Sequence, residues 1–505
     1  MTISDEITVD TIRYLYKSYL SCADFLSPTL LNYIHISTPV EDKIILAAKG
    51  KQIVFVTGNP GDGKTHLIRR VSPEFPADVE VVLDANERSD EELCRIIDKA
   101  YADKTALVVA INEGILLDLC ENVRKKTLWA DAVIDMILRP YTYNEETKKV
   151  PGQTLVLDLN LRNNLSPQIT EQAIDRVVSL VQKDLESPLL ANITSLENPI
   201  IKKRITILLD AVGKTGFHAT MRDLLGFLAY LVCGGEDPAK GIKPYPYYVN
   251  AFGNGVGALF DRVREFDPLF MAYPFLDERI FSGEDEYDEW EIDAPDEYIT
   301  PGNIPVFINR KRRAFFEHKE GELLFTYERS DIDRAFKRLS TKGQSPEFVA
   351  VNLLNKFFGG YKGPDSLVLW FGHQYCARPL RYVASRQDVQ TSDFEVLIPV
   401  LPRHIAEAFT DHYPDHIILK HRTMPITDGL IMDRRFVGML IAGDRLSGFG
   451  IRSLEVQTKI AAFYDRLAKI CTHTRPVVQI LRLDNQKMEK IGVSVDDLTY
   501  YVPGA

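Results

Sequence analysis

The sequence predicts an α/β fold with a parallel sheet, and two observations indicate it. The first is an alternation of helical stretches with short apolar runs, at residues 53–56, 79–83, 107–111 and 155–159. These runs consist mostly of Val, Ile and Leu, a composition typical of strands buried on both faces, and alternation with helices is typical of parallel sheets. The second is a glycine-rich segment that directly follows the first run.

The glycine-rich segment, residues 58–65, matches G-x-x-x-x-G-K-[ST] in full. A strand is expected before it and a helix after it, which is the context that this phosphate-binding motif requires. Glycines let successive backbone N–H groups point inward, and a helix N-terminus favours polyanions. We therefore expect ATP and Mg²⁺ as cofactors. The candidate nucleotide-binding residues are Gly58, Asn59, Pro60, Gly61, Asp62, Gly63, Lys64, Thr65 and His66.

Within this motif, Lys64 would place a positive charge near the β- and γ-phosphates. The hydroxyl of Thr65 is the expected Mg²⁺ ligand. Hydrolysis further requires carboxylates that position water and support the metal.

Two strand ends compete for the carboxylate role. The third apolar run ends in Asn112 and Glu113, where AAA-like and related hydrolases usually carry Asp-Glu. The second run ends in Asp84, with Glu87 shortly after, in the chain order of GTPase-like folds. We favour the third run, because a sheet of at least four strands with an inserted neighbour suits the AAA-like order.

On that interpretation Glu113 polarises the attacking water. Asn112 could still accept a hydrogen bond from a metal-bound water, but it carries no charge. Asp84 would lie near the site as a metal candidate beside Thr65.

Two further polar residues are candidates for contacts with the γ-phosphate. Asn160 follows the fourth run, although Asp158 or Asn163 could take its role because strand ends are uncertain by about two residues. Arg222 lies in the first turn of a helix expected to start near Thr220, in the region of a lid. Catalytic candidates are therefore Glu113, Asn112, Asn160 and Arg222.

Four motifs, at 58–66, 110–114, 157–162 and 220–225, together resemble a known family. They read GNPGDGKTH, AINEG, LDLNLR and TMRDLL. The combination is similar to AAA-like ATPases of bacterial defence loci, in particular the DptF type, a component of DNA-phosphorothioation-dependent restriction systems. The resemblance implies a P-loop NTPase (AAA-like) core and the roles given above to Lys64, Thr65 and Glu113.

The resemblance also implies a cytoplasmic, energy-coupled subunit of a complex that acts on foreign DNA. Expected partners are the other subunits, with a separate nuclease or helicase among them, and DNA, contacted directly or through those partners; an oligomer is compatible with this. One alternative is a nucleotide-dependent scaffold that hydrolyses ATP poorly because Asn112 replaces Asp. A nucleotide kinase or small-molecule phosphotransferase is disfavoured by the 505-residue length.

The sequence is divided into four expected segments. They are an N-terminal helical segment (1–50), the P-loop ATPase core (51–200), a helical lid with an acidic insertion (201–360) and a C-terminal α+β domain (361–505). No apolar run approaches the roughly 20 residues that span a bilayer, and the N-terminus is polar and acidic. Six scattered cysteines form no CxxC. We therefore expect a cytoplasmic protein with reduced thiols and no membrane contact.

The net charge of −11 argues against a surface that is basic throughout, as in generic nucleic-acid binders. Residues 284–297 hold nine of the acidic side chains, so the remainder is close to neutral. The segment 310–342 is basic and could contact DNA phosphate or supply an arginine to a neighbour's nucleotide. Arg162 and Arg204 are equally possible sources of that arginine.

Overall fold

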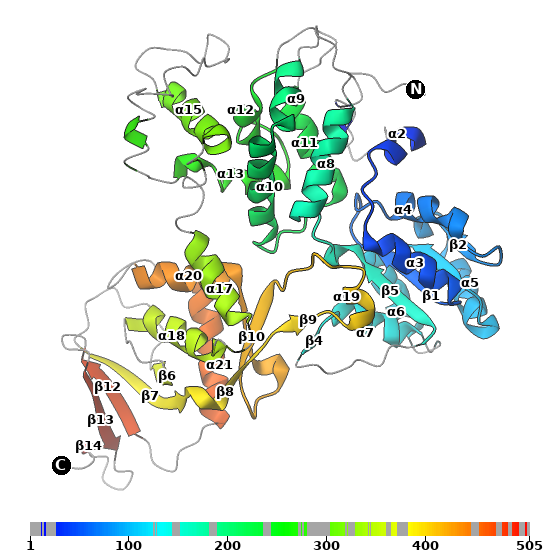
Figure 1. The fold of residues 1–505 in the computed structure, drawn as a ribbon. Coiled ribbons are helices and arrows are strands. Elements are labelled where there is room, and N and C mark those ends of the chain that lie inside the picture. The colour runs from blue at the N-terminus through cyan, green and yellow to red at the C-terminus, as the bar shows by residue number, and fades with distance from the viewer. Residues whose placement is uncertain are drawn as a thin grey trace. The chain divides into compact units, whose positions relative to one another are not determined.

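Figure 1 shows the computed structural model of the chain. The residues that it describes are 12, 15–16, 27–124, 127, 129–143, 152–180, 189–235, 244–270, 274, 277–279, 304–318, 321, 329–341, 343, 345–359, 365–370, 382–445, 454–470, 477–482, 487–493 and 500–501. The chain divides into two compact units. Unit 1 comprises Met1–Thr142, Thr147–Tyr327 and Leu401–Tyr413, and unit 2 comprises Tyr143–Glu146, Glu328–Val400 and Pro414–Ala505. The division into four segments stays a prediction.

Unit 1 contains a four-stranded parallel sheet, which confirms the predicted α/β class. In spatial order its strands are β2 (Glu80–Val82), β3 (Leu107–Ala110), β1 (Ile53–Thr57) and β5 (Thr154–Asp158). All four overlap the predicted apolar runs. Because β1 pairs Val56 with Ala110 and Thr57 with Asp158, the carboxyl ends of these strands meet at one edge of the sheet.

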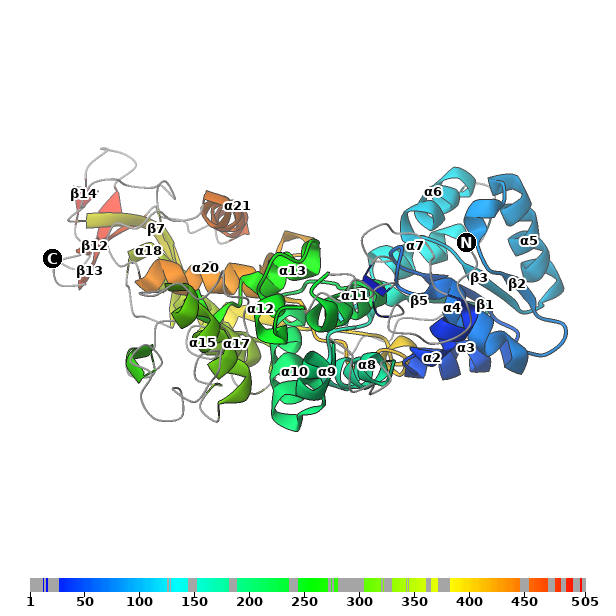
Figure 2. The same cartoon turned by 90° about the horizontal axis from the view of Figure 1, so that it is seen from above.

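Helices cover both faces of this sheet, since side chains alternate along each strand. Val54 and Val56 share one apolar core with α3 (Pro39–Lys49) and α4 (Lys64–Val71). Ile53 and Phe55 face the other core, with α5 (Asp90–Asp103), α6 (Glu113–Val123) and α7 (Ala130–Leu138). Figure 2 shows α5 and α6 on the side of the sheet opposite α3.

A second layer of unit 1 is built from helices alone. Its helices are α2 (Pro28–Tyr33), α8 (Pro167–Ser179), α9 (Leu190–Glu197), α10 (Pro199–Gly213), α11 (Met221–Cys233), α12 (Tyr247–Ala251), α13 (Ala258–Arg264) and α15 (Ile304–Glu317). Local signals set where they begin. Ser166 caps α8 ahead of a proline at its first position. Thr220 and Asp223 form a reciprocal capping box on α11, which ends at the left-handed Gly234.

The segment Leu401–Tyr413, which we call the strap, belongs to unit 1 although its neighbours in sequence belong to unit 2. It carries the short helix α19 (Arg403–Ala406). Apolar side chains of the strap join the core beneath β1, namely Leu401, Ile405, Ala408 and Phe409. Burial of these side chains is what attaches the strap to unit 1.

Unit 2 is an α+β assembly with two antiparallel sheets. One sheet holds β11 (Leu430–Asp433), β10 (His416–His421) and β8 (Phe394–Leu397). The other holds β14 (Tyr500–Tyr501), β13 (Lys487–Val493), β12 (Val477–Arg482), β7 (Tyr382–Gln390) and β6 (Ser366–Trp370). Its helices are α17 (Arg329–Leu339), α18 (Pro346–Gly359), α20 (Arg434–Arg445) and α21 (Leu454–Ile470). Two short strands, β4 (Thr142–Tyr143) and β9 (Pro399–Val400), lie where the chain crosses from one unit to the other.

Some sequence predictions fall on residues outside the described ranges. These are the acidic stretch at 284–297 and the basic residue Lys342. Within the described ranges, every helix is too short or too polar to cross a bilayer. The described cysteines 94, 120 and 233 are free thiols.

Candidate functional site

The glycine-rich loop joins the end of β1 to the start of α4, as the motif predicts. Gly58 has φ +136° and Gly61 has φ +100°, a region that residues with a Cβ rarely adopt. A Cβ on Gly58 would lie 2.8 Å from Asp62 Oδ2, and one on Gly61 would lie 3.2 Å from Thr220 Oγ1. Both glycines are therefore required by backbone conformation and by close neighbours.

Lys64 lies inside the loop rather than in solvent. Its side chain is 9% exposed, and Nζ donates to Gly58 O at 3.0 Å and to Asn59 O at 2.8 Å. Burial lowers the pKa of Lys64, while the charges of Asp62, Asp158 and Asp84 act in the opposite direction. The ammonium is thus held by loop carbonyls and surrounded by carboxylates from two strand ends.

Asp62 forms hydrogen bonds within the loop and to residues outside it. Its carboxylate accepts a hydrogen bond from the Asn59 N–H at 2.7 Å and another from His218 Nε2 at 3.0 Å. Its carbonyl accepts from Arg162 Nη2 at 2.7 Å. Asp62 is 1% exposed, so its side chain is used for contacts within the protein. No local sequence signal pointed to His218 or Arg162 as partners of the loop.

The end of β2 lies beside the start of α4. Thr65 Oγ1 donates to Leu83 O at 3.2 Å, and Asp84 is the next residue along the chain. Asp84 is also close enough to Lys64 for its charge to act on that ammonium. The two candidate metal ligands, Thr65 and Asp84, therefore lie at the same edge of the sheet.

The ends of β3 and β5 meet across β1. Glu113 is the first residue of α6, and Asn160 lies in a short turn after β5. Asn160 Nδ2 donates to Glu113 Oε2 at 2.5 Å, and Asn160 Oδ1 is buried with no hydrogen-bond partner among the described residues. Asn112 precedes α6 and makes no side-chain capping bond.

Asp158 titrates near neutral pH in this environment. Burial raises its pKa to about 6, and the charges of Glu113 and Asp62 raise it further, while the Asn160 N–H acts in the opposite direction. The carboxyl edge of the sheet thus holds a buried carboxyl group, Asp158, whose pKa is raised by burial and by neighbouring acidic residues.

The strand order corrects the reason for preferring Glu113 over Asp84. That preference assumed a strand inserted between the loop strand and the carboxylate strand. Instead β3, which precedes Glu113, pairs directly with β1, and β2, which precedes Asp84, is one strand further out. Strand β3 therefore lies between the loop strand β1 and the outer strand β2. The GTPase-like order expected for Asp84 is also wrong, because β2 does not pair with β1, and both carboxylates stay candidates.

Helix α11 starts against the phosphate loop. The N–H of Arg222 donates to Gly61 O at 3.3 Å, and a Cβ built on Gly61 would lie 3.3 Å from the Arg222 Cβ. These contacts place Arg222 beside the loop, where the sequence predicted it to lie. His218, four residues earlier, contacts Asp62.

His66 is directed away from the loop centre. Its Nε2 shares a hydrogen bond of 3.2 Å with His35 Nδ1, and His35 in turn contacts Glu41. Burial lowers the pKa of His66 to about 4, aided by the charges of His35 and Arg70. His66 is therefore neutral at physiological pH, and its described contacts are with the segment around α3.

The predicted basic residues outside the loop lie in both units, with α15 in unit 1 and α17 in unit 2. Arg162 and Arg204 are both buried, so neither is presented to a neighbouring molecule. Three basic side chains of α15 pair with carboxylates of the same unit: Lys311 with Asp277, Arg312 with Asp267 and Arg313 with Glu317. The prediction that Arg162 or Arg204 supplies an arginine in trans is not supported by this burial.

No protein-family model matches the chain, and neither a curated protein nor a solved structure is found to be similar to it. Among the described residues, no group of three or more His, Cys, Asp or Glu side chains could hold a metal by itself. Any Mg²⁺ at the loop would therefore need ligands beyond the protein's carboxylates, as is usual for Mg²⁺ bound together with phosphates.

Proposed function

We propose that this protein binds ATP with Mg²⁺ at residues 58–65 and hydrolyses it. One observation carries the proposal: a buried lysine inside a left-handed glycine loop lies beside the carboxylate and amide side chains that end the neighbouring parallel strands. Lys64, Asp84 and Glu113 are the charged members of that arrangement. A P-loop NTPase (AAA-like) core accounts for it better than a structural turn does.

The loop is suited to phosphate by its backbone. The first N–H groups of α4 have no acceptor within the helix, and the helix dipole favours an anion at this end. Lys64 Nζ, now 2.8 Å from Asn59 O, would exchange a loop carbonyl for phosphate oxygens. The ammonium then interacts with a full negative charge, which is a stronger interaction than with a carbonyl dipole.

The residues also fit Mg²⁺. Thr65 and Asp84 provide hydroxyl and carboxylate oxygens, the ligand type that Mg²⁺ prefers. When bound, Mg²⁺ would neutralise phosphate charge. The Thr65 hydroxyl could offer an oxygen lone pair to Mg²⁺ while its proton stays donated to Leu83 O.

Glu113 is the residue proposed to orient the attacking water. Its hydrogen bond to Asn160 restricts the rotation of the carboxylate, so one oxygen stays available at the loop. Arg222, held at Gly61, would add positive charge to the γ-phosphate when the start of α11 closes on it. Asn112 carries no charge and would contribute only hydrogen bonds.

We further propose, on the motif resemblance alone, that the ATPase is the energy-coupled subunit of a bacterial defence complex of the DptF type. Its partners would be other subunits, with a nuclease or helicase among them, and DNA would be contacted directly or through them. Unit 2 would pass on the nucleotide state. The chemistry proposed for the loop does not depend on this context.

The test is calorimetric titration of ATP and of GTP, with and without Mg²⁺, into the full chain and into Lys64→Ala, together with measurement of phosphate release. We expect Mg²⁺-dependent ATP binding that Lys64→Ala weakens by at least about tenfold, and phosphate release that it abolishes. Binding without release, with and without DNA, would favour the scaffold alternative. No binding by the wild type would refute the proposal.

A further inference from the structure

Arg162 connects the phosphate loop to the turn between β5 and α8. Its guanidinium is buried in unit 1, and Nη2 donates to Asp62 O at 2.7 Å. The peptide that joins Asp62 to Gly63 is planar and trans, so its C=O and N–H point in opposite directions. Holding Asp62 O on one side therefore turns the Gly63 N–H toward the other side, where the loop would receive phosphate.

The strap holds the turn that carries Arg162 at two points, one on each side of it. His412 Nδ1 donates to Leu161 O at 3.1 Å, and Ser166 Oγ donates to Asp411 Oδ2 at 3.0 Å. Leu161 also packs with the apolar side chains of the strap in one core. The turn is thus fixed by hydrogen bonds and by apolar burial.

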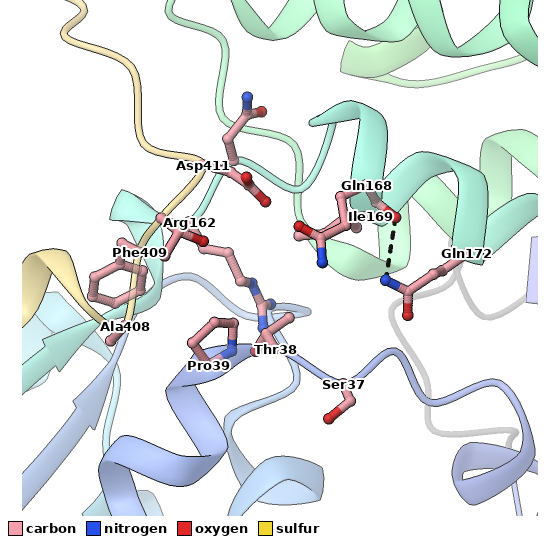
Figure 3. Close-up of a pocket in the computed structure, with 12 residues that line it drawn as sticks. Ser37, Thr38, Pro39, Arg162, Gln168, Ile169, Gln172, Ala408, Phe409 and Asp411 are labelled. Carbon is pink, nitrogen blue, oxygen red and sulfur yellow. Dashed lines mark hydrogen bonds between the residues drawn. The ribbon is translucent and has the colours of Figure 1, made fainter.

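A small cavity lies where these parts meet (Figure 3). Its lining includes Arg162, Thr38 and the strap residues Phe409 and Asp411, and its volume is about 20 Å³. In Figure 3 the side chain of Arg162 extends from beside Phe409 toward Thr38. A space of that size holds about one water molecule, and Arg162, which is buried, lines it together with Phe409 and Asp411 of the strap. A shift of the strap would consequently displace Arg162.

We propose that Arg162 is a positioning residue for the phosphate loop and that the strap sets its position, so that nucleotide affinity depends on the strap. The proposal rests on the proposed function, since it concerns the affinity of the same loop for ATP. The chain enters the strap from Val400 and leaves it at Pro414, both in unit 2. The strap is therefore a covalent route by which a change in unit 2 reaches the loop.

The experiment measures ATP affinity by calorimetry, and the melting temperature, for four variants of the full chain. Arg162→Gln removes the charged hydrogen bond and should weaken ATP binding by about tenfold. Arg162→Lys, which keeps the charge, should restore part of that loss. Asp411→Ala removes the acceptor for Ser166 and should weaken binding by about threefold. Arg403→Ala, a truncation on the strap of a side chain that is 96% exposed, is the matched control and should bind as the wild type does.

The double variant Arg162→Gln with Asp411→Ala decides whether the strap acts through Arg162. If it does, the double variant binds ATP no more weakly than Arg162→Gln alone. Additive losses would overturn the action of the strap through Arg162. Unchanged affinity in a folded Arg162→Gln protein would overturn the positioning role.

If the wild type binds ATP and Arg162→Gln does not fold, Asp411→Ala carries the test: a lower melting temperature with unchanged affinity would refute the proposal, and weaker binding that Arg403→Ala does not share would support it. If the wild type itself binds no nucleotide, the proposed function fails first, and the two failures are distinguished by the wild-type titration.

Discussion

Asn160 Nδ2 donates a hydrogen bond of 2.5 Å to Glu113 Oε2, and this bond spans the central strand of the sheet. It forms because Glu113 follows β3 and Asn160 follows β5, the two neighbours of β1. The Asn160 amide holds the Glu113 carboxylate in one orientation and carries no charge itself. The relationship assigns separate roles to the two residues, and these can be tested.

Glu113→Gln is expected to lower the turnover number by 10²–10⁴-fold, about the contribution of a positioned general base, with ATP affinity unchanged. Asn160→Ala should lower it by about tenfold, because the carboxylate is still present but is no longer oriented. Single-turnover phosphate release measures both effects. Glu121→Gln, at an exposed position of the same helix, is the control. If Glu113→Gln released phosphate at the wild-type rate, Glu113 would not orient the attacking water. Asp84, after β2, would then be the remaining candidate.

Asp84→Asn is expected to raise the Mg²⁺ concentration required for half-maximal activity by about tenfold, because one anionic ligand becomes neutral. ATP binding without Mg²⁺ should not weaken, since the removed charge is negative. The measurement is a Mg²⁺ titration of phosphate release. Glu80→Gln, an exposed carboxylate at the start of the same strand, should behave as the wild type does. An unchanged Mg²⁺ requirement in Asp84→Asn would exclude a metal role for that residue.

Gly58→Ala is expected to reduce stability by about 1–3 kcal/mol, because a Cβ would be strained at φ +136° and would meet Asp62 Oδ2 at 2.8 Å. The variant should also lose ATP affinity, since relief of the strain moves the loop. Chemical denaturation and calorimetry measure the two effects. At Gly152 a Cβ would meet nothing within 4 Å, so Gly152→Ala is the control and should change neither. A fully stable Gly58→Ala protein would contradict the left-handed geometry of the loop.

Asp158→Asn is expected to stabilise the protein above pH 6 and to have little effect near pH 4. Burial raises the pKa of Asp158 from 3.8 to about 6, so the folded state retains a proton that the unfolded state has lost. The contribution of this group to stability is therefore greatest at low pH and falls as the pH rises to about 6, by up to about 3 kcal/mol. Asparagine preserves the acceptor for the Asn160 N–H and removes the charge.

Denaturation of the wild type and of Asp158→Asn at pH 4.5, 6 and 7.5 measures this effect. The difference between the two proteins should grow with pH. The comparison also removes the contribution of His66, whose lowered pKa makes stability increase with pH over an overlapping range. A difference that is constant with pH would show that Asp158 is ionised throughout.

Local features of the sequence predicted much of unit 1. The apolar runs located the four strands, and the motif located the loop between β1 and α4. The helix expected to start near Thr220 begins at Met221, directly after that residue. These predictions were possible because strand burial, helix caps and left-handed glycines depend on residues a few positions apart.

Other features depend on contacts between distant residues, and only the tertiary structure decided them. The loop's bonds to Arg162 and His218 join residues 100 and 156 positions apart, and Ser166 meets Asp411 of the strap across 245 positions. The strand order, which put β3 beside β1, likewise has no local signal. The sequence by itself determined a glycine-rich loop at the end of a buried strand. Packing determined what surrounds that loop, because the geometry of a buried charge or carbonyl is set by whichever partners the whole fold brings within hydrogen-bond distance.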